Sequence, residues 1–154
     1  MFFVCIGDNK KRKEWYDLLI ENNLSVINVI DSSAIVSNNA FIGNGNFVGK
    51  MAIINSHAVV GDNCIINTKA LIEHGCHIKN YVNISTNTVL NGDVVCEEGS
   101  FIGSCSVISG QKCIGSWATV GAGSVVVRDV DNEITVVGCP AYNIIERKIK
   151  NEKN

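Results

Sequence analysis

The chain has 154 residues, which is enough for one domain with its own hydrophobic core. Its 13 basic and 15 acidic residues leave a formal net charge of -2 without a basic run in the body of the sequence, so we expect neither nucleic acid nor an anionic membrane as its main partner. No stretch approaches the about 18 consecutive apolar residues of a membrane-spanning helix, and the first residues reverse the charge order of a secretory signal.

Cysteine is frequent, but neither the number nor the spacing of the cysteines suits a disulfide framework. The seven positions are Cys5, Cys64, Cys76, Cys96, Cys105, Cys113 and Cys139. Their number is odd, no CxxC motif occurs, and no export signal precedes them. The sequence therefore predicts a reduced, cytoplasmic protein that uses cysteine as a small buried apolar residue.

Residues 1–33 are expected to form a small β-α-β fragment. FFVCIG reads as a strand that ends at Gly7, residues 10–22 as an amphipathic helix, and LSVINVI as a second strand. One face of the helix is expected to carry Trp15, Leu18 and Leu19. Because such a fragment is too small to stand alone, we expect it to pack on the first coil of the region that follows.

The region of residues 34–130 repeats with a period of six. The repeating positions are Val36, Ile42, Val48, Ile54, Val60, Ile66, Ile72, Ile78, Ile84, Leu90, Cys96, Ile102, Ile108, Ile114, Val120 and Val126, with no polar residue and no insertion among them. A period of six fits neither a helix, at about 3.6 residues per turn, nor an ordinary strand, at two. It is typical of a β-solenoid built from hexapeptide repeats.

Each hexad also carries corner-forming residues at fixed places. Small side chains prevail two positions before the apolar ladder residue, and Gly or Asn one position after it, as at Gly43, Gly61 and Gly103. Gly and Asn tolerate the positive φ of a tight corner, so we expect the left-handed backbone one position after the ladder. Three hexads per turn predict a triangular prism of just over five coils, roughly 25 Å tall at the ~4.8 Å spacing of strands.

The residues directly before the ladder are expected to point outward, yet many are apolar, among them Phe41, Phe47, Leu71 and Val89. Exposed apolar rows of this extent usually form a partner surface, and the open ends of a solenoid need capping. The pattern therefore predicts a homo-oligomer.

Residues 131–154 depart from the hexad pattern. They pass through VVGCPA, which contains the only proline of the chain, and end in the charged stretch KIKNEKN. We expect a strand followed by a short helix from about residue 143, with a frayed end.

At this point the sequence resembles the hexapeptide-repeat acyltransferases, and within them the bacterial sialic acid O-acetyltransferase and UDP-4-amino-sugar N-acetyltransferase family. The matching stretches include FFVCIGDNKKRKEW, NVIDSSAIVS, IINTKALIEHGCHI, FIGSCSVI, GAGSVVVRDV and VVGCPA, and together they span essentially the whole chain. The resemblance implies a left-handed parallel β-helix, a homotrimer, acetyl-CoA as the donor, and three active sites that each lie between neighbouring subunits.

The resemblance also implies roles for particular residues. The catalytic base is the histidine of the Glu-His pair, which falls on His74, and Glu73 is a candidate to orient it. The implied donor contacts are Asn83, Ser104 and Ala122, and Gly7 is the implied acceptor contact. Asn67, one hexad before Glu73, is a further candidate for the acceptor and equally a simple corner former. Two positions depart from the family pattern: Gly75 replaces an acidic residue, and Asn83 replaces a second histidine. The family also begins with a strand and a glycine-rich loop for the nucleotide of the substrate, and this sequence starts after them.

The spacing suggests how His74 could act. With eighteen residues per coil, Ser56 and Gly92 occupy the equivalent places on the coils before and after it, and both are small enough to leave a notch. An imidazole with a pKa near its ordinary value of about 6.5 suits removal of a proton from an attacking hydroxyl or amine at neutral pH. Backbone N–H groups at the corners could stabilise the tetrahedral oxyanion.

Two other functions remain open on the sequence alone. Some hexapeptide-repeat proteins are zinc-dependent carbonic anhydrases, for which the candidate ligands would be His57, His74 and His77; the outward wall position of His77 argues against convergence within one subunit. A catalytically degenerate binding protein is the other alternative, because of Gly75, Asn83 and the absent glycine-rich loop. The preferred hypothesis is an acetyltransferase that acetylates an amino or hydroxyl group of a sugar.

Overall fold

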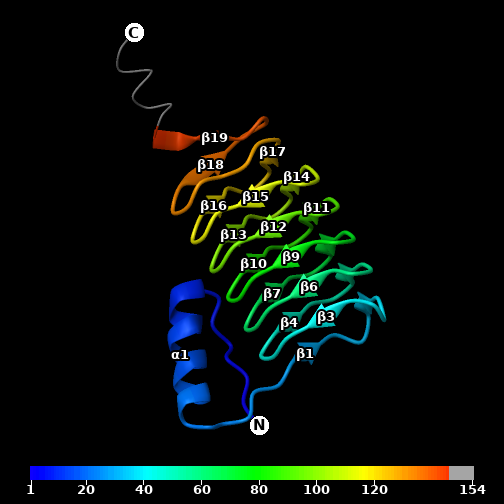
Figure 1. Cartoon of the computed structure of the whole chain (residues 1–154), viewed down its shortest axis with the longest axis vertical. Helices are drawn as coiled ribbons and strands as arrows, with labels where there is room; N and C mark the ends of the chain where they lie inside the picture. The colour runs from blue at the N-terminus through cyan, green and yellow to red at the C-terminus, as the bar shows by residue number, and fades with distance from the viewer. Residues whose placement is uncertain (146–154) are drawn as a thin grey trace.

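The computed structural model describes residues 1–145 and shows a parallel β-solenoid with one helix, α1 (Asn9–Glu21), along its side (Figure 1). The first sheet contains β1 (Val29–Ile30), β4 (Phe47–Val48), β7 (Ile65–Ile66), β10 (Asn83–Ile84), β13 (Phe101–Ile102), β16 (Thr119–Val120), β18 (Thr135–Val137) and β19 (Tyr142–Asn143). The second contains β2 (Ile35–Val36), β5 (Ile53–Ile54), β8 (Leu71–Ile72), β11 (Val89–Leu90), β14 (Val107–Ile108) and β17 (Val125–Val126). The third contains β3 (Phe41–Ile42), β6 (Val59–Val60), β9 (His77–Ile78), β12 (Val95–Cys96) and β15 (Cys113–Ile114).

The register explains why the sequence repeats every six residues. Within the solenoid, residues eighteen apart pair in parallel, as Asn83 does with Phe101 and Val89 with Val107. Each coil therefore consists of three hexads, one for each sheet. The predicted left-handed parallel β-helix is confirmed, with about six turns, because β1 and β18 extend the ladder at both ends.

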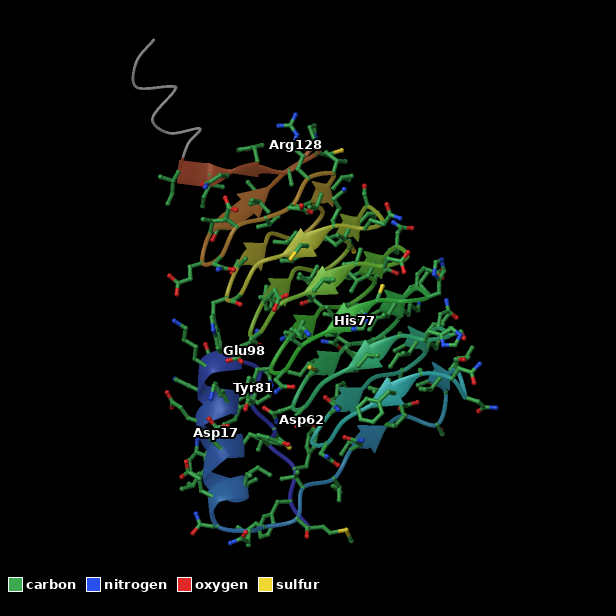
Figure 2. The ribbon with its side chains drawn as sticks, in the orientation of Figure 1. Asp17, Asp62, His77, Tyr81, Glu98 and Arg128 are labelled. Carbon is green, nitrogen blue, oxygen red and sulfur yellow. The ribbon has the colours of Figure 1, made fainter. Side chains whose placement is uncertain are left out.

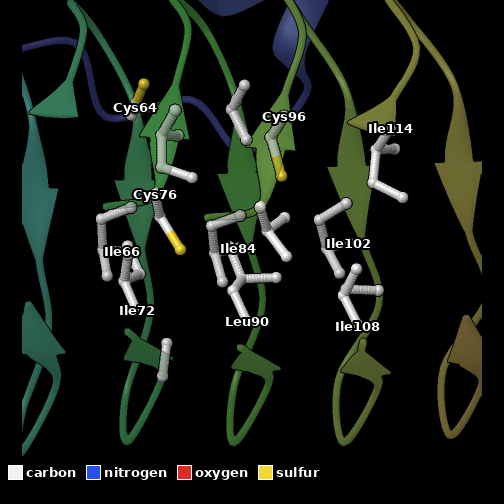
Figure 3. Packing of buried hydrophobic residues seen from close by; sticks show 14 of the residues in the cluster. Cys64, Ile66, Ile72, Cys76, Ile84, Leu90, Cys96, Ile102, Ile108 and Ile114 are labelled. Carbon is white, nitrogen blue, oxygen red and sulfur yellow. The ribbon is translucent and has the colours of Figure 1, made fainter. Parts of the chain in front are cut away.

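The ladder residues fill the interior of the prism. From Val48 to Val126 each has at most 1% of its surface exposed, and like residues of successive coils stack on one another (Figure 3). Cys64, Cys76 and Cys96 also lie inside, and burial raises the pKa of these thiols, to about 12 for Cys64 and about 11 for Cys76. All seven cysteines are free; the use of cysteine as a buried apolar residue is correct for these three, whereas Cys5, Cys105 and Cys139 are exposed.

The corner geometry differs from the prediction. The positive φ falls three positions after the ladder residue, at His57, Gly75 and Trp117 for example, and not one position after it. The glycines directly after the ladder are needed for another reason: the next coil passes so close that a Cβ at Gly103 would lie 2.5 Å from the backbone nitrogen of Ala122. Close packing of coils therefore selects glycine there, while the left-handed position accepts many residue types.

The three edges of the prism position the candidate site residues. The first edge joins the first and second sheets and includes residues 67–70, 85–88, 103–106 and 121–124. The second edge joins the second and third sheets and includes residues 55–58, 73–76 and 91–94. The third edge joins the third and first sheets and includes residues 61–64, 79–82, 97–100 and 115–118.

The N-terminal region also departs from its prediction in detail. Residues 2–7, which we call the arm, make one parallel bridge, between Phe2 and Val26, in place of a full strand pair. The helix lies along the third edge beside several coils rather than on the first coil, since Asn9 donates hydrogen bonds to the carbonyls of Gly99 and Ser100.

The helix buries a different face from the one expected. Asn9, Arg12 and Tyr16 are buried, whereas Trp15 and Leu18 are 54% and 47% exposed. Polar contacts of the arm and the third edge, and not apolar area alone, therefore decide which face is covered.

The last coil is closed by β18 and β19. β18 continues the first sheet in parallel beyond β16, and β19 turns back antiparallel to β18. The predicted strand of residues 131–154 is present, whereas the helix expected from about residue 143 falls largely on residues 146–154, which lie outside the described residues. No helix within residues 1–145 has the length and apolar content that crossing a bilayer requires.

Candidate active site

His74 lies on the second edge, two residues after β8, and its side chain is exposed. Its imidazole covers Gly92 of the next coil, because a Cβ at Gly92 would lie 2.6 Å from Cε1 and 2.7 Å from Nε2. On the preceding coil, the carbonyl of Ser56 accepts a hydrogen bond from the N–H of Gly75 at 3.2 Å. Because Gly92 has no side chain, the ring has room to lie over it, and His74 stays exposed. The notch between the coils stays a prediction.

Glu73 does not contact His74 in the way that an orienting acid would. Its half-buried carboxylate accepts a hydrogen bond from Nδ2 of Asn55, one coil before, at 2.9 Å. Over the described residues, the imidazole of His74 has no hydrogen-bond partner and no ion pair. The role of Glu73 therefore stays a prediction.

A second carboxylate, which sequence reasoning missed, lies beside Gly75, the residue after His74. Gly75 has a φ of +67°, and a Cβ at this position would collide with Oδ1 of Asp93 on the next coil. The main chains are joined here as well, since the N–H of Asp93 donates to the carbonyl of His74 at 3.0 Å. Asp93 thus occupies the space in which a side chain at residue 75 would start. Its signal in the sequence is its place eighteen residues after Gly75.

The implied donor contacts Ser104 and Ala122 lie on the first edge, on adjacent coils, as their spacing predicts. The N–H of Gly123 donates to the carbonyl of Ser104 at 2.8 Å, which locks the two corners together. Ala122 is exposed and Ser104 is half-buried. Asn67 belongs to the same edge two coils earlier, where its Oδ1 accepts from the N–H of Thr68 at 2.8 Å and shapes its own corner.

Asn83 and Gly7, assigned to different roles, lie together on the first sheet. Asn83 occupies an outward position of β10, yet only 7% of its surface is exposed because the arm covers it. Its Nδ2 donates to the carbonyl of Gly7 at 3.5 Å, and its Oδ1 has no partner within the described chain.

Two hollows flank Gly7 on the outer face of the first sheet. One, of about 270 Å³, is lined by the arm residues 3–7 with Phe47 and Ile65. The other, of about 300 Å³, is lined by residues 7–10 with Gly99, Phe101, Trp117 and Thr119. Neither hollow includes His74, whose ring faces solvent in a single copy of the chain.

The groups expected to act together therefore occupy opposite edges of the second sheet. His74 lies on the second edge, while Ser104 and Ala122 lie on the first. The outward row of the sheet between them is entirely apolar and consists of Ile35, Ile53, Leu71, Val89, Val107 and Val125. Within one copy of the chain, the two edges therefore stay apart.

The alternative metal site is not assembled within one copy. His57 lies on the second edge, one coil before His74, while His77 is on the outer face of the third sheet, away from α1 (Figure 2). Among residues 1–145 no three His, Cys, Asp or Glu side chains gather in a way that could hold a metal ion.

Comparisons with known proteins give the fold a context. The acetyltransferase domain of PglB from Neisseria gonorrhoeae, also solved in complex with acetyl coenzyme A, is 32% identical with a TM-score of 0.91, over 92% of this chain and 69% of that one. A perosamine N-acetyltransferase variant from Caulobacter crescentus, solved with CoA and GDP-perosamine, is 33% identical with a TM-score of 0.90, over 92% of this chain and 67% of that one.

A third relative is similar over a shorter stretch of the chain. A serine acetyltransferase from Buchnera aphidicola is 35% identical over 79 residues, which are 46% of this chain and 29% of that enzyme. The chain thus spans less than a third of this relative. No protein-family model matches the chain.

The repeated hexads, the left-handed solenoid and these similarities define the class: the chain belongs to the hexapeptide-repeat acyltransferases. Within that class, the solved structures that it matches over 92% of its length include an acetyltransferase domain and a perosamine N-acetyltransferase.

Proposed function

We propose that the protein is an acetyl-CoA-dependent acetyltransferase that acetylates an amino or hydroxyl group of a sugar, free or nucleotide-linked, with His74 as the general base. The observation that carries the proposal is the match of 92% of the chain, at 32–33% identity, to an acetyltransferase domain solved with acetyl coenzyme A and to a perosamine N-acetyltransferase solved with CoA and GDP-perosamine. On this view it is a cytoplasmic member of the sialic acid O-acetyltransferase and UDP-4-amino-sugar N-acetyltransferase family.

The functional unit in this proposal is a homotrimer. Placing the apolar outer row of the second sheet around a threefold axis buries that row and sets the second edge of each copy against the first edge of the next. His74 of one copy then faces Ser104 and Ala122 of its neighbour. Because thirty and forty-eight residues separate them from His74 at eighteen per coil, they lie about 8 and 13 Å further along the axis, in line with a pantetheine arm that runs along the edge.

The chemistry follows from this arrangement. The acceptor hydroxyl or amine attacks the thioester carbonyl of acetyl-CoA while Nε2 or Nδ1 of His74 takes its proton. As the tetrahedral intermediate collapses, the C–S bond breaks, and the imidazolium of His74 gives the proton to the departing thiolate, so that CoA leaves as its thiol. Corner N–H groups that the solenoid does not use are suited to stabilise the oxyanion. The absence of a side chain at Gly92 lets the imidazole lie over it, and the exposure of His74 leaves the ring open to an acceptor.

A direct assay tests the proposal. Purified protein is incubated with acetyl-CoA and a panel of free and nucleotide-linked amino sugars, and release of free thiol is followed. Turnover with at least one sugar, lost in His74→Ala and insensitive to a chelator, is expected. Binding of acetyl-CoA without turnover on any acceptor would instead identify a degenerate binding protein, and loss of activity with a chelator would favour metal-dependent chemistry.

A further inference from the structure

Arg12 is a cation buried between α1 and the solenoid. Only 1% of its surface is exposed, and the described residues supply no salt bridge to its guanidinium. Burial lowers the pKa of Arg12, the direction expected when a cation leaves water. Burying a cation costs free energy unless its N–H groups are satisfied, so its retention here calls for a specific contact set.

That contact set consists of main-chain carbonyls from three separate segments. Nε donates to Asn63 at 2.9 Å, and Nη2 donates to Tyr81 at 2.8 Å, both on the third edge. Nη1 donates to Ile6 at 3.3 Å and to Gly7 at 3.1 Å, both in the arm. Arg12 thereby ties α1, two coils of the solenoid and the arm to one point.

The two arm contacts fix the direction of the neighbouring N–H groups. In a planar trans peptide the C=O of one residue and the N–H of the next point in opposite directions. With the carbonyls of Ile6 and Gly7 turned inward to Arg12, the N–H groups of Gly7 and Asp8 must point outward. Within residues 1–145 neither N–H donates a hydrogen bond.

The outward side is open and concave. Gly7 and Asp8 are exposed, and a Cβ at Gly7 would meet no atom within 4 Å. Gly7 lines both hollows on the first sheet, and Asp8 lines the larger one. The side chain of Asn83 supports the same carbonyl of Gly7 from the solenoid side, at 3.5 Å.

We propose that Arg12 is a positioning residue for the acceptor: it holds the arm so that the N–H groups of Gly7 and Asp8 bind a hydroxyl oxygen of the sugar. The inference rests on the proposed function, in which Gly7 contacts the acceptor. A hydroxyl is favoured over a phosphate because the carboxylate of Asp8, engaged by the N–H of Lys11 at 2.9 Å, lies beside the two donors and repels an anion.

Arginine suits this position and lysine does not. A guanidinium presents five N–H donors in a rigid fork, and here four hydrogen bonds reach four carbonyls. An ammonium offers three donors from a single atom and cannot span the arm and the third edge together. Arg12→Lys keeps the charge but releases at least one side of the contact.

The first experiment measures acceptor and donor parameters separately in Arg12→Lys and Arg12→Met. We expect the KM for the acceptor to rise at least about tenfold, while the Kd for acetyl-CoA stays within about twofold. Lys11→Met is the matched control, because Lys11 is exposed on the same helix, and it should behave as the wild type. An unchanged acceptor KM, or an equal loss for acceptor and donor, would overturn the proposal.

Gly7→Ala tests the proposal if the Arg12 variants do not fold, and hydrogen exchange tests it if no acceptor is found. Gly7→Ala folds without a clash but places a methyl group before the two N–H groups, so it should also raise the acceptor KM; a wild-type KM would contradict the proposal even if the Arg12 variants do not fold. If the wild type transfers acetyl to no acceptor, the proposed function fails. Amide hydrogen exchange of the arm then tests separately whether Arg12 holds the arm in place. Faster exchange of residues 3–8 in Arg12→Lys than in Lys11→Met supports the positioning, and equal exchange refutes it.

Discussion

The wall of the solenoid and the arm with α1 are stabilised in different ways. In the wall, each residue has a role set by its place in the hexad, and the same contacts recur on every coil. The arm and α1 instead depend on single polar contacts, above all those of Arg12 and Asn9 with main-chain carbonyls. Many equivalent residues share the stabilisation of the repeated wall, whereas a few individual residues hold the arm and α1 in position.

The largest expected effect is the loss of kcat when His74, a residue of the solenoid, is replaced. His74→Ala should lower kcat by about 10²–10⁴-fold, because it removes the proposed general base, and should leave acetyl-CoA binding intact. His77→Ala is the matched control, since His77 is also exposed but lies on the third sheet, and its activity should stay near the wild type. Steady-state kinetics and calorimetry provide the two measurements, and equal activity of the two variants would contradict the assignment.

Packing provides the next contrast between wall and helix. Ile84 is fully buried within the ladder, so Ile84→Ala should lower the free energy of unfolding by about 2–5 kcal/mol. Leu18 of α1 is 47% exposed, and Leu18→Ala should change the same quantity by no more than about 0.5 kcal/mol. Denaturant unfolding of both variants at one protein concentration measures the difference. Similar losses would mean that the helix face is assigned wrongly.

Substitutions at two glycines can distinguish the two constraints on the corners, which are the close approach of the next coil and the left-handed backbone. A Cβ at Gly115 would lie 2.6 Å from the backbone nitrogen of Asn132, so Gly115→Ala should cost about 2–3 kcal/mol through overpacking. Gly123 has a φ of +68°, and a Cβ there would meet no atom within 4 Å, so Gly123→Ala should cost only the left-handed backbone penalty of about 1–2 kcal/mol. Thermal unfolding ranks the two, and the reverse order would refute the close-approach explanation.

The smallest effect is one of reactivity. The buried thiols of Cys64 and Cys96 have raised pKa values and lie inside the prism, so a thiol reagent near pH 8 should label them only after unfolding. The exposed Cys5 and Cys139 should react in the native protein. Mass spectrometry of native and denatured samples identifies the labelled positions. Native labelling of Cys96 would contradict a closed prism.

The wall of the solenoid could be predicted from the sequence because the same residue pattern recurs in every hexad. The ladder from Val36 to Val126 predicted the solenoid, the three-hexad coil, and the neighbours of His74 at Ser56 and Gly92. It did not predict the place of the positive φ, because glycine satisfies both a left-handed backbone and a close approach of coils. Composition alone cannot separate these two demands.

The arm and the site depend on contacts between distant segments, which no periodicity records. The apolar side chains of Trp15 and Leu18 suggested the buried face of α1, yet Arg12 occupies it because its N–H groups reach four carbonyls there. The signal was present in the helical spacing of Asn9, Arg12 and Tyr16. Likewise, Asp93 could have been found by adding one coil to Gly75.

The central claim is a site shared by two copies, and mixing two inactive variants tests it most directly. His74→Ala removes the proposed base on the second edge, and Ala122→Trp blocks the proposed donor position on the first edge. The proposed trimer of either variant alone should therefore be inactive. The two variants are mixed in equal amounts, unfolded together and refolded. In random mixed trimers, about one contact in four between neighbouring copies joins an intact second edge to an intact first edge, so the mixture should regain about a quarter of wild-type activity. Mixed trimers, verified by native mass spectrometry, that remain inactive would show that the two edges do not form one site.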